Sequence, residues 1–345
     1  GGNDTIYLSA GADIEDGGEG TDTIIFGPDQ TTLPVTINLD TGRYHFTSQL
    51  VSVTQNLISI ENVTSEGGAD LTIYDTSGVN VITTNTGNDT IHSKGGNDTI
   101  TTGSGDDTVY LGNGTYTVDL GAGNDKVYLS TTASSINGNT GTDEAVVRAF
   151  DGFVDVYIDL QFSTYFVPSK LTAQDGMDVS LESFENVTID GNVSATLLGT
   201  SAANTLIGDS GADVLTGRGG ADILTGGSKS DKFVFMTGDT GITEATADTI
   251  TDFSTGTDKI DIDAPGTYVE ADGTNTADLA GFITNANASL TTVSDDIYAE
   301  YNFTGNGNTI LVVDENASST VDAGDTLIIL IGLSTAGGLD ASDFI

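Results

Sequence analysis

Several residue types are missing from this sequence or scarce in it. Its 345 residues include no cysteine, no tryptophan, 2 histidines and 9 lysines and arginines in total. Without cysteine, a disulfide scaffold, thiol chemistry and a cysteine-ligated zinc site are excluded. The shortage of basic residues argues against nucleic-acid binding, because neutralising phosphates needs clusters of Lys and Arg. No apolar run approaches the roughly 20 residues of a membrane-spanning helix, so we expect no membrane insertion.

Motifs of common catalytic sites are missing as well. His45 and His92 do not form the His-Glu-x-x-His pattern of a catalytic zinc site. The sequence has no Gly-x-Ser-x-Gly nucleophile elbow. Acidic pairs are so numerous that no glycosidase pair stands out. We therefore expect a protein that is not an enzyme, with both histidines at its surface.

Acidic residues and glycine are abundant. There are 51 Asp and Glu residues, a formal net charge of −42, and 45 glycines. Strong negative charge with few aromatics usually marks disorder. Asp and Gly, however, suit tight turns, and carboxylates suit hard cations such as calcium. The sequence starts part-way through a repeat, without Met or a signal peptide, so we expect a piece of a longer protein.

A nine-residue pattern, Gly-Gly-x-Gly-x-Asp-x-U-x with U a large apolar residue, recurs in three blocks. Residues 17–25 (GGEGTDTII) fit it fully. In the central block the U position is always apolar: Ile73, Ile82, Ile91, Ile100, Val109, Val118, Val127 and Ile136. The acidic position holds Asp4, Asp13 and Asp22 in the first block, Asn80, Asp89, Asp98, Asp107, Asp125 and Asp143 in the second, and Asn204, Asp213, Asp222 and Asp231 in the third.

This spacing predicts an all-β fold, a parallel β-roll. A six-residue turn and a three-residue strand reverse the chain every nine residues, so strands 18 residues apart stack in parallel with U inward. Such a core is thin: ordering a residue costs roughly 1–2 kcal/mol, and one buried aliphatic returns roughly 1.5–3 kcal/mol. A calcium ion ligated by Asp oxygens and turn carbonyls would remove the carboxylate repulsion. Multiple calcium ions are therefore predicted.

The two edges of the central block differ. One edge carries an unbroken series with three intervals for calcium, and the other offers at most one ordinary site, near Asn80 and Asp98. The unbroken series is Asp89, Asp107, Asp125 and Asp143, and the other edge continues with Tyr116 and Ser134. In the first block Asp4 pairs with Asp22, and Asp13 lies on the opposite edge. In the third, Asp213 pairs with Asp231 and Asn204 with Asp222. Glu15 at a U position and Lys229 at a turn glycine depart from the pattern.

These repeats resemble the RTX family, the haemolysin-type calcium-binding repeats of bacterial secreted proteins. The resemblance implies one calcium between turns 18 residues apart. It extends to the segments between the blocks: Val35–Leu39 with Ile60–Val63, and Val156–Leu160 with Phe184–Val187, are similar to strand pairs that interrupt RTX arrays. Residues 231–235, 248–253 and 256–262 are similar to the C-terminal secretion region of serralysin-type and surface-layer RTX proteins. The closing Asp343-Phe344-Ile345 resembles a type I secretion signal, or forms a last strand.

We expect six segments: first β-roll turns at 1–27, a strand spacer at 28–67, a central β-roll at 68–147, a second strand spacer at 148–198, a third β-roll at 199–235, and a C-terminal capping and type I secretion region at 236–345. One helix is predicted around Ala277–Leu290. Asp314-x-Asn316-x-Ser318, with Asp322 and Asp325, has a spacing like an EF-hand loop between two strands. A calcium site and a polar hairpin both fit this loop.

Two functions fit the sequence. The first is a calcium-binding extracellular structural protein, folded on calcium after type I secretion, in a bacterial surface layer or adhesin. Its expected partners are calcium, the secretion machinery, and either further copies in a lattice or a cell-surface polysaccharide. The alternative is the C-terminal secretion and folding module of an RTX protease, lipase or epimerase. Ice binding is disfavoured, because the outward row Thr90, Thr99, Thr108 and Thr117 is short.

Overall fold

The computed structural model describes residues 1–8, 14–27, 34–47, 52–129, 134–148, 155–161, 164–167, 177–262, 267–270, 276, 278–290, 296–303, 305, 307–315, 318–333 and 338–345. The chain divides into two compact units. Unit 1 comprises Gly1–Arg148, Ser163–Phe166 and Asp175–Phe184, and unit 2 comprises Ala149–Phe162, Val167–Gln174 and Glu185–Ile345. β20 (Thr164–Val167) contributes residues to both.

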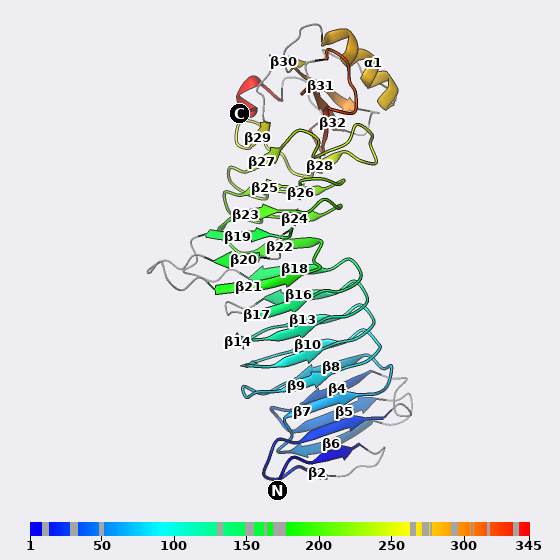
Figure 1. The fold of residues 1–345 in the computed structure, drawn as a ribbon, viewed down its shortest axis with the longest axis vertical. Coiled ribbons are helices and arrows are strands. Elements are labelled where there is room, and N and C mark those ends of the chain that lie inside the picture. The colour runs from blue at the N-terminus through cyan, green and yellow to red at the C-terminus, as the bar shows by residue number, and fades with distance from the viewer. Residues whose placement is uncertain are drawn as a thin grey trace. The chain divides into compact units, whose positions relative to one another are not determined.

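Unit 1 is a roll with two parallel faces (Figure 1). One face consists of β1 (Thr5–Tyr7), β3 (Thr23–Phe26), β7 (Asn62–Ser65), β9 (Val81–Thr83), β12 (Thr99–Thr101), β15 (Thr117–Asp119), β17 (Ser134–Asn137) and β21 (Met177–Glu182). The other consists of β2 (Ile14–Asp16), β6 (Ser52–Ile58), β5 (Arg43–Thr47), β4 (Val35–Asn38), β8 (Leu71–Tyr74), β10 (Thr90–His92), β13 (Thr108–Tyr110), β16 (Lys126–Leu129) and β18 (Glu144–Arg148). The short β11 (Gly95–Gly96) and β14 (Asn113–Gly114) pair at a turn.

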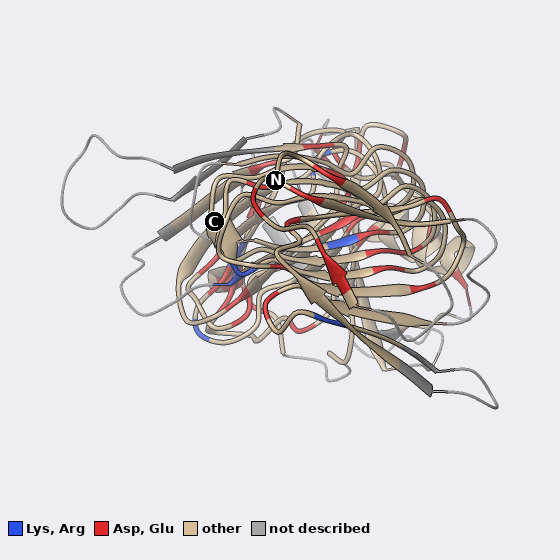
Figure 2. Cartoon of the chain, turned by 90° about the horizontal axis from the view of Figure 1, so that it is seen from below, with Lys and Arg blue, Asp and Glu red and all other residues tan. Residues whose placement is uncertain are grey.

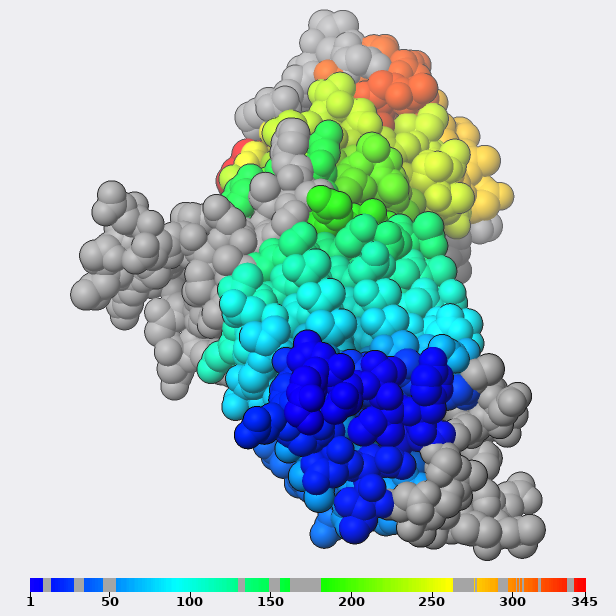
Figure 3. All heavy atoms as spheres, turned by 60° about the horizontal axis from the view of Figure 1, so that its bottom comes forward, coloured from blue at the N-terminus to red at the C-terminus, as the bar shows by residue number. Residues whose placement is uncertain are grey.

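The predicted register is confirmed. On one face Ile91 pairs in parallel with Ile73 and Val109, and on the other Ile100 pairs with Ile82 and Val118. All eight U side chains of the central block are at most 2% exposed. Successive coils of the central block pack directly on one another, and Figure 3 shows them in adjacent shades of light blue to cyan. The core is therefore one aliphatic side chain deep on each face, as the repeat predicts.

Unit 2 repeats this arrangement. One face consists of β19 (Asp155–Asp159), β23 (Ser194–Leu198), β25 (Val214–Thr216), β27 (Lys232–Phe235) and β29 (Lys259–Ile262). The other consists of β22 (Asn186–Asp190), β24 (Thr205–Ile207), β26 (Ile223–Thr225), β28 (Asp248–Ile250), β33 (Thr326–Leu330), β32 (Asn308–Val313), β31 (Asp296–Phe303) and β30 (Thr267–Glu270). Leu206, Leu215, Leu224 and Phe233 fill its U positions and are 0% exposed.

The spacer segments differ from the expected strand pairs. In the first, β4 pairs in parallel with β8 on one face, whereas β7 pairs with β3 and β9 on the opposite face. In the second, β19 pairs with β23, and β22 pairs with β24. The two strands of each expected pair are thus coils of the roll. The extra residues of the first spacer form the antiparallel excursion β4–β5–β6.

The predicted helix is confirmed as α1 (Leu279–Ser289), with Asp278 as its N-cap and Leu290 as its C-cap; Ala277 lies outside the described residues. Phe282, Ala286 and Leu290 pack with Tyr298 of β31 and Val312 of β32. No helix in the described part of the chain has the length and hydropathy needed to cross a membrane.

The last residues lie against β29. A short 3₁₀ helix, η2 (Ala341–Asp343), precedes a parallel bridge between Phe344 and Ile260. The Ile345 N–H donates to the Ile260 carbonyl oxygen at 3.0 Å. The closing residues therefore extend a sheet edge, in accordance with the expectation of a last strand.

Candidate calcium sites

Aspartates link each coil of unit 1 to the next. The Oδ1 atom of each one accepts a hydrogen bond from the backbone N–H of the residue 18 positions earlier. The donors and acceptors are Leu71 to Asp89 (2.7 Å), Asp89 to Asp107 (2.7 Å), Asp107 to Asp125 (2.8 Å) and Asp125 to Asp143 (2.8 Å). The structure thus brings together the unbroken series predicted for this edge. Figure 2 shows the acidic residues in red on coil after coil, with few basic residues in blue among them.

Unit 2 has such rows on both edges. The N–H of Ala195 donates to Asp213 Oδ1 at 2.6 Å and that of Asp213 to Asp231 Oδ1 at 2.9 Å. On the other edge the N–H of Asn204 donates to Asp222 Oδ1 at 2.7 Å. Each predicted pair of the third block is therefore in contact.

Both rows of unit 2 continue further than the sequence pattern indicates. The N–H of Asp222 donates to Asp248 Oδ1 at 2.8 Å, across 26 residues, and that of Asp231 to Asp258 Oδ1 at 3.0 Å, across 27 residues. Sequence reasoning missed both acceptors because longer loops break the nine-residue phase. The remaining signal is the Asp-x-Ile triplet, Asp248-Thr-Ile and Asp258-Lys-Ile.

The second carboxylate oxygens are the atoms available to a cation. Among the described residues, Oδ2 is buried without a hydrogen-bond partner in Asp22, Asp89, Asp107, Asp125, Asp213, Asp222, Asp231 and Asp248. These side chains are at most 1% exposed. Burial raises the pKa of Asp213 to about 7 and that of Asp248 to about 8. A buried carboxylate in this state requires a proton or a metal ion.

At Asp22, Asp213, Asp222 and Asp231, a turn glycine five residues earlier leaves space beside Oδ2. A Cβ atom on Gly208 would lie 2.3 Å from Asp213 Oδ2 and 2.9 Å from the carbonyl oxygen of Gly226 in the next coil. Carboxylate and carbonyl oxygens from two coils therefore face the same point, and these are the hard ligands that calcium takes. In the described part of the chain no three Asp, Glu or His side chains converge. Backbone carbonyls would thus complete the coordination, and the residues fit calcium.

Among the described residues of the first block, Asp22 is the acid buried between coils. Asp22 is 0% exposed, and its Oδ1 accepts the N–H of Asp4 at 2.6 Å. The Asp4 side chain itself is 52% exposed. Asp13 lies outside the described residues. Glu15 occupies its U position in β2, so this coil places a half-buried acid where other coils have a buried aliphatic side chain.

The opposite edge of the central block holds its polar atoms differently. Asn80 Oδ1 accepts hydrogen bonds from Thr76 N at 3.3 Å and Thr76 Oγ1 at 3.0 Å, and its Nδ2 donates to the Glu61 carbonyl oxygen. Asp98 Oδ1 accepts the Asn80 N–H at 2.8 Å, and its Oδ2 accepts Ser93 Oγ at 2.8 Å. The predicted Asn80 ligand is therefore already engaged as a turn cap.

A buried acid on this edge was not predicted. Asp75 is 0% exposed, and its Oδ2 has no hydrogen-bond partner among the described residues. Burial raises its pKa to about 7, and the nearby Asp98 carboxylate adds to this. Asp75 stands at the first-glycine position of its repeat, so the pattern gave no reason to select it. Any cation on this edge would lie between Asp75 and Asp98.

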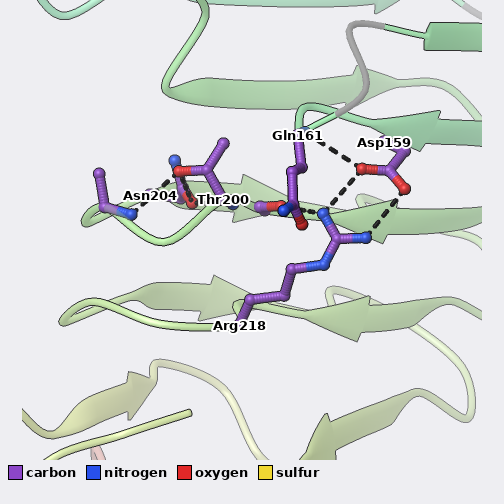
Figure 4. Close-up of polar contacts among 7 residues, drawn as sticks. Asp159, Gln161, Thr200, Asn204 and Arg218 are labelled. Atoms are coloured by element: carbon purple, nitrogen blue, oxygen red, sulfur yellow. Dashed lines mark hydrogen bonds and ion pairs between the residues drawn. The ribbon is translucent and has the colours of Figure 1, made fainter.

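An arginine lies at the corresponding edge of unit 2 (Figure 4). Asn204 Oδ1 accepts the Thr200 N–H at 2.6 Å, as Asn80 does from Thr76. Arg218 Nη1 donates to the Gly199 carbonyl oxygen at 2.6 Å and to Asp159 Oδ1 at 2.7 Å, and its Nη2 donates to Asp159 Oδ2 at 2.8 Å. A guanidinium thus bonds to a turn carbonyl in the predicted Asn204–Asp222 interval. This interval has a built-in organic cation.

The loop between β32 and β33 holds the last predicted ligands, and Lys229 is a departure from the repeat. Asp314 is 0% exposed at the start of the loop between β32 and β33, which also holds Asp322, while Asn316 lies outside the described residues. Lys229, which replaces a turn glycine, has a φ of 88° and donates from Nζ to Asn192 Oδ1 at 2.6 Å. It keeps the glycine-like backbone despite the strain that a side chain has there.

Comparison with known proteins gives one family. A family model for the RTX calcium-binding nonapeptide repeat, in four copies, matches residues 1–27, 72–100, 83–118, 94–127 and 198–232. Among solved structures, the chain is similar to the extracellular lipase LipA from Serratia marcescens, at 14% identity and a TM-score of 0.21. That match covers 81% of this chain and 40% of the lipase chain, so the chain spans less than half of its length. No curated protein matches.

Proposed function

Because the chain carries the calcium-binding nonapeptide repeats of the secreted RTX proteins, it binds several calcium ions, and we propose that it is a non-catalytic structural segment of a bacterial surface-layer or adhesin-type protein. The observation that carries the proposal is the set of buried carboxylate oxygens that face turn carbonyls. A chain of this kind stays open without calcium and closes with it.

The residues that would hold calcium form four groups: Asp22; Asp89, Asp107, Asp125 and Asp143; Asp213 and Asp231; Asp222 and Asp248. Calcium supplies positive charge and a bridge between coils when bound. The chain itself orients the carboxylates. Backbone N–H groups donate to Oδ1, and Oδ2 stays buried without a hydrogen-bond partner and is available to a cation. The coils then stack with a single aliphatic layer between the faces.

Export and folding follow from calcium levels. At low calcium the carboxylates repel one another, which keeps the chain extended and suits passage through a type I secretion channel. Extracellular modules have calcium dissociation constants of about 10⁻⁴–10⁻³ M. At tenfold excess over the dissociation constant, each site adds about 1.4 kcal/mol of stability. Several linked sites would turn folding on together outside the cell.

The roles of the two histidines support a non-catalytic chain. The His92 ring stacks between those of Tyr74 and Tyr110, with ring centroids 4.6 Å apart in both pairs. His45 Nδ1 is hydrogen-bonded to Thr54 Oγ1 at 3.0 Å across the β5–β6 pair. Each imidazole is thus part of a sheet surface. The proposed partner of such surfaces is a further copy of the chain or a cell-surface polysaccharide.

The test is assembly in calcium. The purified chain, dialysed into about 1 mM calcium as an extracellular level, is examined by electron microscopy and by co-sedimentation with bacterial cell walls. Ordered arrays or cell-wall binding that chelator abolishes would support the proposal. A monomer that binds neither, encoded directly after a His-Glu-x-x-His or Gly-x-Ser-x-Gly domain, would favour the folding module of a secreted enzyme instead.

A further inference from the structure

The hairpin between β32 and β33 has two buried acids at its neck. Val313 pairs with Thr326, so the loop runs from Asp314 to Asp325 and its first and last residues lie next to the last pair of the ladder. Asp314 is 0% exposed and Asp325 is 1% exposed. Successive residues of a strand point to opposite faces. The two aspartates therefore lie on the same side of the hairpin, opposite the side of Val313 and Thr326.

The loop backbone orients both carboxylates. Asp314 Oδ1 accepts the Ser318 N–H at 3.0 Å, and its Oδ2 accepts the Ser319 N–H at 2.7 Å. Asp325 Oδ2 accepts the Asp322 N–H at 2.7 Å. Asp325 Oδ1 is buried and has no hydrogen-bond partner among the described residues. A side chain that is 99% buried therefore has one oxygen unused.

The C-terminal stretch that forms this hairpin carries no basic residue of its own. Residues 260–345 contain no Lys, Arg or His, and the preceding Lys259 contacts Asp343 at 3.6 Å. Burial, and then the negative charges of Asp314 and Asp322, raise the pKa of Asp325 to about 6, while the Asp322 N–H and, least, the Glu315 N–H act against this. Placing two like charges in such a site is unfavourable unless a cation joins them.

We propose that the neck of this hairpin binds one calcium ion through Asp325 Oδ1 and the Asp314 carboxylate, with loop carbonyls as the remaining ligands. The site lies outside the nonapeptide repeats, whose last match ends at residue 232. It would tie the two strands that α1 covers, and it does not depend on the proposed structural role.

The test compares the whole chain with three variants. Asp325→Asn and Asp314→Asn each keep the side-chain size and remove one charge of the site. Glu244→Gln is the matched control, since it removes one charge from an exposed position of the same unit. Bound calcium per chain is counted by equilibrium dialysis with elemental analysis. We expect one ion fewer for each Asp variant and an unchanged number for Glu244→Gln.

Thermal unfolding at two calcium concentrations, one just sufficient to fold the parent and one saturating, gives a second readout. At the lower concentration, Asp325→Asn should unfold at the same temperature as the parent or higher, because a buried unpartnered charge is gone. At saturating calcium it should unfold below the parent. An unchanged ion count, or equal stabilisation of Asp325→Asn at both calcium concentrations, would overturn the site, because the two acids then share a proton. The repeat carboxylates are intact in these variants, so that outcome would leave the proposed function untouched.

Discussion

At the residue scale, Asp213 shows how a ladder aspartate divides its two oxygens between two roles. Its Oδ1 accepts the Ala195 N–H of the preceding coil, which fixes the side chain, and its Oδ2 remains buried near the Gly226 carbonyl oxygen. Asn80 and Asn204 keep the same backbone register but satisfy their amide oxygens with threonines four residues earlier. Asp and Asn at this position thus differ in one side-chain atom: Asp has a second oxygen that can bind calcium, whereas Asn has an NH₂ group and serves as a neutral cap.

A glycine substitution tests the space beside Oδ2. Gly208→Ala should place a Cβ atom 2.3 Å from Asp213 Oδ2, and crowding of this kind costs about 1–3 kcal/mol. The matched control is Gly27→Ala, whose Cβ would meet nothing within 4 Å. Urea unfolding in calcium, with a calcium titration of each variant, measures both effects. Equal stability and equal calcium affinity for the two variants would contradict the assignment of Asp213.

An arginine substitution tests the built-in cation of unit 2. Arg218→Ala should lower the free energy of unfolding by about 2 kcal/mol, the cost of losing charged hydrogen bonds to a buried carboxylate. Because the guanidinium acts without metal, the loss should be the same at saturating calcium and at the lowest calcium concentration that folds the parent. Lys232→Ala is the control, since its ion pair with Asp261 is 38% and 31% exposed and should contribute less than about 1 kcal/mol. A loss confined to one of the two calcium concentrations would refute this role.

Site residues could be predicted from the sequence only where they keep the nine-residue spacing of the repeat. Asp89, Asp107, Asp125 and Asp143 were predictable because each stands two residues before an apolar strand centre. Asp248 and Asp258 follow longer loops, and Asp75 replaces a glycine, so all three escape the pattern although the fold places them with the others. Arg218 escapes for another reason. Its partner Asp159 is 59 positions away, and only the stacking of coils brings them together.

At the scale of elements, one coil is the unit of the fold, and its two turns need not be alike. In unit 1 one edge offers an unbroken aspartate series, while the other presents Asn80, Asp98, Tyr116 and Ser134. Tyr116 is 1% exposed, and its hydroxyl lies 3.3 Å from Ser93 Oγ, the group that donates to Asp98. A buried tyrosine therefore ends the polar row on this edge.

This asymmetry predicts the positions of ions in a crystal grown with calcium. Ions should lie in the three intervals between Asp89, Asp107, Asp125 and Asp143, because backbone hydrogen bonds join these aspartates in series and the Oδ2 atoms of Asp89, Asp107 and Asp125 are buried without a hydrogen-bond partner. The opposite edge should hold at most one ion, near Asp75 and Asp98, and none between Tyr116 and Ser134. Anomalous difference maps locate the ions directly. Equal rows on both edges would contradict the account.

Stacked side chains on the outer face add to the register between coils. The rings of Tyr74, His92, Tyr110 and Tyr128 stack in order, 4.4–4.6 Å apart, and the Arg148 guanidinium lies 4.4 Å from the Tyr128 ring centre. Cross-strand pairs of this kind contribute about 0.2–1 kcal/mol each. His92 was expected at the surface, and it is half-buried within this stack. The sequence contains the spacing of 18 residues, but which side chains touch depends on the coil geometry.

The elements were predictable where the period is strict. The repeat specified three-residue strands, their register and the inward U side chains, and the helical periodicity specified α1. The spacers were predicted from a resemblance to strand pairs that interrupt RTX arrays, which does not specify which strands pair with one another. Only the pairing of β4 with β8 and of β7 with β9 identifies them as coils.

At the scale of the whole molecule, the balance is between a net charge of −42 and a thin core. Burial raises the pKa of several of the acids above the ordinary 3.8, for example to about 7 for Asp107 and Asp222. The folded chain therefore retains protons that the unfolded chain has released. By linkage, metal-free stability is greatest below the unfolded pKa and falls as the pH rises through about 6 to 8.

Lowering the pH should accordingly stabilise the metal-free chain, as calcium does at higher pH. After removal of metal on a chelating resin, the chain should gain a melting transition, and its melting temperature should then rise, as the pH is lowered from 8 to 5, a window set by the raised pKa values. In saturating calcium the same change should give little gain, because protons and calcium compete for the same oxygens. Differential scanning fluorimetry across both series measures this. Metal-free stability that increases with pH over this window would contradict the raised pKa values.

The most direct measurement of the central claim is far-ultraviolet circular dichroism of the whole chain at pH 7.5 during a calcium titration. We predict an unfolded spectrum in chelator and a cooperative change to a β-sheet spectrum as calcium approaches the range of about 10⁻⁴–10⁻³ M, reversed by excess chelator. A β-sheet spectrum that is already complete in chelator, and insensitive to added calcium, would contradict the claim that bound metal closes these coils.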